Sequence, residues 1–182
     1  MLRIAHKSLN ILIVSALFGL GAASALAAPV SLAKDFEYTT LSLDADRWDI
    51  ETNGTDSDDD PEFIAHFDSK IELDLGELAT IPFITGDPDD MLDAYESNLK
   101  GVFHIFDRQK RLPTGFTAPK GYTCRSYRGA MFEGSEPDST DITCYAPYSG
   151  GARTMQIEIK DGSDDSHLKA LQQAVDGIRL SA

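Results

Sequence analysis

Basic residues are scarce in this 182-residue chain, which contains 16 lysines and arginines against 30 aspartates and glutamates. The formal net charge is therefore −14. Nucleic acids and anionic membrane surfaces repel a protein of this charge, so neither is expected as a partner. A partner that is itself a basic protein fits better, because opposite net charges speed the encounter of two proteins.

The few basic residues are also unevenly placed. Residues 35–96 carry 20 acidic residues and only two basic ones, whereas the basic stretch at residues 108–128 carries six basic residues and no acid. One interpretation is a basic patch for an anionic partner. The other is that the two regions face each other in the fold. We favour the second, because surplus acid nearby makes neutralisation easy.

Long apolar segments are missing except near the start of the chain. Two basic residues come first, an apolar run covers about residues 11–20, and the small-residue triplet Ala-Leu-Ala follows at residues 25–27. This layout is typical of a secretory signal peptide cleaved after Ala27. The apolar run is too short for a membrane anchor, since a spanning helix needs ~20 residues. We expect a signal peptide at residues 1–27 and one soluble domain at residues 28–182, exported to the periplasm or the medium.

Cysteine occurs only twice, at Cys124 and Cys144. An even pair in an oxidising compartment is typical of a disulfide. The flanking segments are rich in Tyr, Thr and Phe, as strands are, and the segment between them has the Gly, Ser, Pro and Asp of a turn. We therefore predict a β-hairpin cross-linked by this disulfide, with a register centred on Gly134 if the cysteines face each other. A redox pair or a zinc site is less expected, because neither the cysteine spacing nor the histidines match.

Catalytic signatures are absent as well. The sequence has no Gly-x-Ser-x-Gly elbow, no His-Glu-x-x-His and no phosphate-cradling glycine loop. His66 and Asp68 share one face of a predicted strand, where the carboxylate could orient the imidazole. A hydrolase with this dyad stays open as an alternative, but we predict no catalytic residue, no cofactor and no metal.

The densest acidic segment is TDSDDDPE at residues 55–62. A calcium-binding EF-hand counted from Asp56 needs glycine at its sixth position and glutamate at its twelfth. Pro61 and Phe67 stand at those positions. The segment therefore indicates the solvated connection of a hairpin, with a looser cation site as the alternative.

Alternation of apolar and polar residues predicts strands along much of the chain. The clearest is a single long strand over residues 63–75, whose odd-numbered residues share a buried face and whose even-numbered residues share a wet one. Asn53-Gly54 predicts a tight turn before it, because both residues accept positive φ. Further strands are expected over residues 36–43, 47–52, 102–106 and 154–160.

Two segments with apolar residues at helical spacing predict amphipathic helices. The first spans residues 88–100, with Asp87 as its N-cap and Gly101 at its end. The second lies within residues 165–180, with Asp165 or Ser166 as its N-cap, and closes the chain. Because hairpins dominate, we predict an α+β fold: a largely antiparallel sheet with two main helices packed against it and one disulfide.

Three segments carry a resemblance to a known family: DRWDI at residues 46–50, the capped helix DPDDMLDAYESNLK at 87–100, and the closing helix HLKALQQAVDGIRL at 167–180. Their order resembles that of the PsbP-like superfamily of small exported α+β proteins. The resemblance implies a non-enzymatic binding or accessory module built on a sandwich, and it carries over no functional residue.

These observations together predict an exported, non-catalytic binding or accessory protein whose partner is another protein. A specific version is an acidic inhibitor, or an immunity-type partner, of a basic protein. A carrier of a small ligand or cation, using the sheet face or the acidic segment, is the second hypothesis. The hydrolase is the third.

Overall fold

The computed structural model describes residues 29–56, 60–78, 87–148 and 151–181, so the expected signal peptide lies outside the described residues. Six short or medium strands come first: β1 (Pro29–Ser31), β2 (Thr39–Thr40), β3 (Ser42–Asp44), β4 (Asp49–Thr55), β5 (Pro61–Phe67) and β6 (Ile71–Leu78). The second half contains α1 (Pro88–Val102), β7 (Ile105–Arg108), β8 (Thr123–Ala130), β9 (Ser139–Tyr148), β10 (Gly151–Lys160), α2 (Asp165–Asp176) and β11 (Arg179–Leu180).

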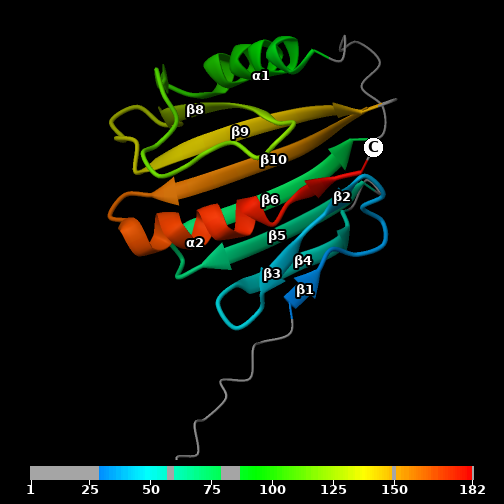
Figure 1. Ribbon diagram of the computed structural model, residues 1–182. Helices are drawn as coiled ribbons and strands as arrows, with labels where there is room; N and C mark the ends of the chain where they lie inside the picture. Colours follow the sequence, from blue (N-terminus) through cyan, green and yellow to red (C-terminus); the bar gives the residue numbers. More distant parts are fainter. Residues whose placement is uncertain (1–28, 57–59, 79–86, 149–150, 182) are drawn as a thin grey trace, which may run out of the picture.

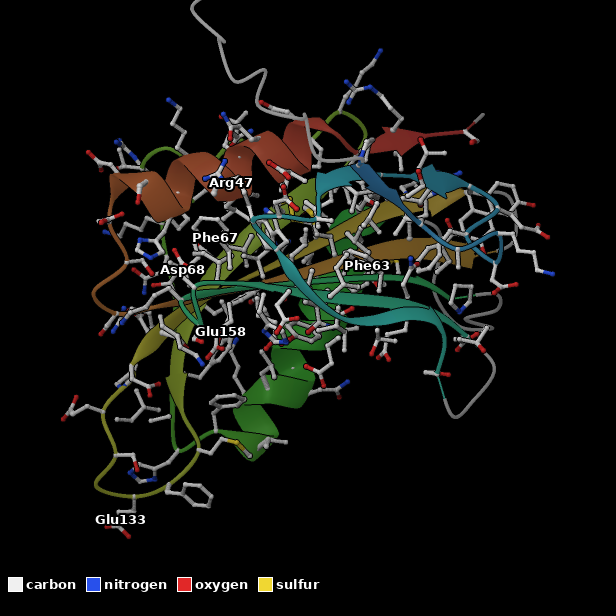
Figure 2. The ribbon with its side chains drawn as sticks, turned by 90° about the horizontal axis from the view of Figure 1, so that it is seen from below. Arg47, Phe63, Phe67, Asp68, Glu133 and Glu158 are labelled. Carbon is white, nitrogen blue, oxygen red and sulfur yellow. A yellow bond between two sulfur atoms is a disulfide. The ribbon has the colours of Figure 1, made fainter. Side chains whose placement is uncertain are left out.

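The main sheet has seven strands in the order β4-β5-β6-β10-β9-β8-β7, and neighbouring strands pair antiparallel throughout. Figure 1 shows α2 lying across the sheet beside β6, with β2 and β3 next to it, and α1 along the β8 side. Figure 2, in the same colours, shows the two helices on opposite sides of the sheet. The predicted α+β fold with two helices packed on an antiparallel sheet is confirmed.

The principal core lies between the sheet and α2. Leu73 and Leu75 of β6 stand opposite Ile157 and Met155 of β10, and all four side chains are buried. Leu171 of α2 belongs to the same cluster. Burying a side chain of this size contributes about 1.5–3 kcal/mol, so the alternation in the two strands is what holds α2 in place.

The long strand expected over residues 63–75 is in fact the β5–β6 hairpin. Asp68 and Ser69 have φ values of 51° and 53°, and the Lys70 N–H donates to the Phe67 carbonyl at 3.0 Å. Phe67 then stands opposite Ile71. The turn therefore keeps odd-numbered residues on the buried face of both strands, which explains why the sequence shows one uninterrupted alternation.

The prediction of a tight turn at Asn53-Gly54 is also wrong, because both residues lie inside β4. The Asn53 side chain is used for tertiary contacts instead. Its Oδ1 accepts from the Ala33 N–H at 2.7 Å, and its Nδ2 donates to the Ser31 carbonyl at 3.1 Å. These bonds fasten the segment that contains β1 to the edge strand of the main sheet.

The helix ends differ from the sequence prediction, most of all at the end of α2, which stops at Asp176 instead of continuing to residue 180. Asp87 does cap α1, accepting from the Asp89 N–H at 2.9 Å, but the helix continues through Gly101. The cap of α2 is Asp164, whose carboxylate accepts from the backbone N–H groups of Ser166 and His167. Sequence analysis missed β11, which follows α2 and pairs with β2.

The predicted cross-linked hairpin is present as β8 and β9. Cys124 and Cys144 stand directly opposite each other in the register, with their sulfur atoms 2.02 Å apart. Gly134 lies in the connecting loop with a positive φ of 82°, a conformation that glycine adopts without strain. The predicted register of this hairpin is therefore confirmed.

Candidate functional site

Three carboxylates stand side by side on the face of the sheet that is opposite to α2. Glu158 of β10 is directly across from Glu72 of β6 on one side and from Asp141 of β9 on the other. We call these three residues the acidic row. Figure 2 shows Glu158 on the opposite side of the sheet from Phe63 and Phe67. Like charges directly opposite on neighbouring strands destabilise a sheet, so this arrangement opposes folding.

The acidic row borders a hollow of about 330 Å³ beside α1. Asp74 of β6 also lines it, two residues from Glu72 and therefore on the same face. Its remaining wall is polar and aromatic, and includes Tyr95 of α1 together with Thr143 and Gln156. The hollow thus combines negative charge, hydrogen-bonding side chains and one aromatic ring.

The two most enclosed carboxyl groups at this site hold their protons unusually tightly. Burial, followed by the nearby carboxylates of Glu62 and Glu72, raises the pKa of Asp74 to about 6. Burial likewise raises the pKa of Asp141 to about 6, with Glu158 as the second cause. Both effects have one origin, which is a set of desolvated negative charges that lie close together.

The basic side chains in contact with the acidic row are partly open to solvent. Lys160 Nζ lies 3.8 Å from a carboxylate oxygen of Glu158, and His66 Nδ1 lies 3.6 Å from one of Glu72. Exposed ion pairs of this kind contribute at most about 1 kcal/mol. Arg128 also lowers the pKa of Asp141, but by less than burial raises it, so the negative charge of the row is only partly compensated within the described residues.

The His66–Asp68 pair of the hydrolase alternative is not joined by a hydrogen bond in the described structure. His66 Nε2 lies 2.7 Å from a carboxylate oxygen of Glu51 on β4, whereas Asp68 lies in the β5–β6 turn. Both residues border a shallow hollow of about 460 Å³ beside Trp48. The histidine is therefore oriented by Glu51, a partner that local sequence spacing does not reveal.

Two arginines of the basic stretch, Arg108 and Arg125, are paired with acids of α1. Arg125, whose side chain is only 10% exposed, donates to Asp93 at 2.5 Å, Glu96 at 2.7 Å and Asp89 at 2.8 Å. Arg108 also contacts Glu96, at 3.2 Å. The three acids belong to α1 and hence to the acid-rich half of the sequence. For these arginines, the interpretation that the two regions face each other is confirmed.

The acidic segment at residues 55–62 connects β4 and β5, and Thr55 stands opposite Pro61, so the expected hairpin connection is confirmed. The Asp60 N–H donates to an Asp56 carboxylate oxygen at 3.0 Å.

Among the described residues, no group of three or more His, Cys, Asp or Glu side chains is placed to hold a metal ion. Within the same ranges, neither helix is both long enough and apolar enough to cross a lipid bilayer.

Comparison with known proteins gives a match in structure but not in sequence. No protein-family model matches the chain, and no curated protein matches it. The solution structure of cyanobacterial PsbP (CyanoP) from Synechocystis sp. PCC 6803 superposes with a TM-score of 0.51, covering 90% of this chain and 99% of that chain at 12% identity. The chain has a PsbP-like fold. The resemblance drawn from the order of elements is thereby confirmed.

A second solved structure is also similar. LpqN, which is involved in cell envelope biogenesis of Mycobacterium tuberculosis, matches with a TM-score of 0.41 and 16% identity. The match covers 79% of this chain and 83% of LpqN.

Proposed function

We propose that this protein is an exported accessory protein without catalytic activity, and that it binds a basic segment of a partner protein on the acidic row. Residues 28–182 form the exported domain in this proposal, after removal of residues 1–27. Lysine or arginine side chains of the partner enter the hollow beside α1. There they meet Glu72, Asp141 and Glu158.

The register of the acidic row carries the proposal. Three carboxylates placed directly across from one another cost folding free energy, and replacing one of them by a neutral residue would remove that cost. Surfaces that sacrifice stability in this way are commonly functional. A cationic side chain from a partner is attracted to all three carboxylates and offsets their mutual repulsion.

The composition of the hollow supports a basic side chain as its occupant. Tyr95 supplies an aromatic ring beside the carboxylates, and the cation of lysine or arginine is attracted to such a face. Thr143 and Gln156 supply further hydrogen-bonding groups. The overall negative charge of the chain speeds the approach of a basic protein.

Export is supported by the cysteine pair and by the leader sequence. Disulfides persist in oxidising compartments outside the cytoplasm, and Cys124 and Cys144 lie at disulfide distance. The charged start, short apolar run and small-residue triplet of residues 1–27 are typical of a cleaved signal peptide. Both observations support a periplasmic or secreted location.

A defined octalysine peptide tests the binding surface. Its affinity is measured for the wild type, for a row variant (Glu72→Gln, Asp141→Asn, Glu158→Gln), and for a control variant of equal net charge. The control carries Glu37→Gln, Asp46→Asn and Asp176→Asn, which are exposed acids outside the row. We expect the row variant to lose at least about fivefold more affinity than the control in about 50 mM salt, where screening is weak.

The position of the bound peptide is followed by NMR. The backbone amides of Thr143 and Gln156, which line the hollow, should shift on addition of octalysine. Equal loss of affinity in the row and control variants would show that net charge alone attracts the peptide. The acidic row would then have no role of its own.

A further inference from the structure

We propose that the tip of the β8–β9 hairpin, residues 131–138, is a second docking element, which inserts Phe132 and Met131 into an apolar pocket of a partner protein. Lysine or arginine side chains border that pocket on the partner. This inference rests on the proposed function in one respect, namely that the partner is a basic protein. The tip lies outside the acidic row.

The apolar side chains of the tip are unusually exposed. Phe132 is 71% exposed and Met131 is 52% exposed. Val102 at the end of α1 is 58% exposed, and it lies at the same corner, because Ile105 pairs with Ala130. In the described part of the chain, these three are the large apolar side chains left open to solvent. Aromatic side chains that become buried in a partner's pocket are typical binding hot spots.

Arg128 fastens the base of the tip to the turn after β10. Its guanidinium donates to the Pro137 carbonyl at 2.8 Å and to both carboxylate oxygens of Asp161 at 2.8 Å. The Asp161 N–H in turn donates to the Asp138 carbonyl at 2.7 Å. A loop that is ordered before binding loses little conformational entropy on docking, so its apolar contacts contribute more fully to affinity.

The disulfide adds to this order. It cross-links the two strands that carry the tip, because Cys124 is on β8 and Cys144 is on β9. Figure 2 shows Glu133 at the outer end of the hairpin, away from the sheet and both helices. A protruding, braced loop with an aromatic residue is suited to enter a concave site.

The charge around the tip identifies the kind of partner. Glu133, Glu136 and Asp138 are exposed beside the apolar pair, and no lysine or arginine occurs between Arg128 and Arg153. An anionic lipid surface repels such a tip. A second copy of this chain, with its net charge of −14, is repelled as well. A pocket bordered by basic residues is complementary to it.

The tip and the acidic row can contact one partner. Asp141 belongs to the row and follows Asp138 of the tip by three positions, at the start of β9. The two surfaces are therefore neighbours, and the partner contributes basic residues to both.

Photo-crosslinking in the cells that encode the protein tests the tip directly. The photoreactive residue p-benzoylphenylalanine is introduced in place of Phe132, and in a control in place of Glu37. Glu37 is exposed and lies beyond the opposite end of β9, because Tyr38 stacks on Tyr148. We expect an adduct with another protein at position 132 but not at position 37. The cross-linked peptide should be apolar and flanked by lysine or arginine.

The purified partner then allows a quantitative measurement. Phe132→Ser and Met131→Ser together should weaken binding at least about tenfold, as expected for a hot spot. Glu133→Gln with Glu136→Gln should weaken the dependence of affinity on salt. Because these side chains are exposed, the melting temperature of each variant should match the wild type, which separates lost binding from lost folding.

Several results would overturn the inference: no adduct at position 132, an adduct with a second copy, an adduct with lipid, or unchanged affinity of the Phe132→Ser, Met131→Ser variant. If that variant binds normally while the row variant does not, the tip inference fails and the proposed function stands. If the tip variant loses binding and the row variant does not, the acidic row is the part that fails.

Discussion

Asp141 on β9 and Glu158 on β10 stand directly opposite each other, and Glu158 has a second carboxylate, Glu72, on its other side. Nothing in the folding of a seven-stranded sheet requires acids at these positions. The face towards α2 is built for stability, with buried Leu, Ile, Met and Phe side chains. On the opposite face the acidic row lowers stability, although Met91 and Leu92 of α1 are buried as well.

Removing one charge from the acidic row should stabilise the protein. For Glu158→Gln we expect the free energy of unfolding to rise by about 0.5–1.5 kcal/mol, because two repulsive cross-strand pairs disappear. The contact from Lys160, at 3.8 Å, is weak and its loss offsets little of the gain. Urea denaturation at neutral pH measures the change. The exposed Glu37→Gln control should stay within about 0.5 kcal/mol of the wild type, and a destabilised Glu158→Gln protein would contradict the repulsion argument.

Stability should increase as the pH falls from about 7 to about 5. The pKa values of Asp74 and Asp141 are raised to about 6, so the folded chain binds these protons more tightly than the unfolded chain does. Protonation in this window therefore favours folding, by about 1–2 kcal/mol once solvent screening is allowed for. Melting temperatures across the range check this, and the Asp74→Asn, Asp141→Asn double variant should show a flatter profile.

Below about pH 4 the trend should reverse. Hydrogen bonds from Arg125 and Arg128 lower the pKa of Asp93 and Asp161 respectively. A carboxylate with a lowered pKa stabilises the fold above its unfolded pKa, and this stabilisation is lost as the pH falls through its folded pKa. The expected stability maximum between about pH 4 and pH 5 would be disproved by a melting temperature that declines steadily from pH 7 downward.

Arg125 should be the residue that fastens α1 to the sheet. Replacement by methionine leaves the buried carboxylate of Glu96 without its closest cation, which should cost about 2–4 kcal/mol. Lys100→Met is the matched control, because Lys100 is 62% exposed and its Nζ lies 4.0 Å from Glu96, so its loss should cost under about 0.5 kcal/mol. Hydrogen exchange should show faster opening of α1 in Arg125→Met only. Adding Glu96→Gln to that variant should restore part of the stability.

Reduction of the disulfide should lower the free energy of unfolding by about 3 kcal/mol, on the model in which the cross-link restricts the unfolded chain across 20 residues. Chemical denaturation with and without reductant measures the difference. Native protein should take up no alkylating reagent unless it is reduced first. Uptake of two alkyl groups by untreated protein would show that both thiols are free.

The sequence was sufficient to predict which side chains of most strands are buried, but not where the strands end. The alternation from Phe63 to Leu75 identified the buried side chains correctly. The turn at Asp68 escaped notice, because the segment Asp-Ser-Lys lacks glycine, proline and asparagine and preserves the alternation. Asn53-Gly54 gave the opposite error: its turn propensity was overridden by the contacts of the Asn53 side chain.

The acidic row could not have been found from local sequence patterns. Glu72, Asp141 and Glu158 each look like an ordinary polar residue on the wet side of a strand. Only the pairing of β6 with β10, which are more than 70 residues apart, brings Glu72 next to Glu158. By contrast, the register of the Cys124–Cys144 hairpin is local, and the cysteines themselves defined it.

The pairing of β2 with β11 has a consequence for how the protein is made. Leu180 stands opposite Thr39, and the Ser181 N–H donates to the Tyr38 carbonyl at 2.8 Å. A chain that emerges amino end first thus presents an early segment whose partner arrives about 140 residues later. The β2–β11 pair can therefore form only after residues 179–181 have left the ribosome, which makes it a late step of folding during synthesis.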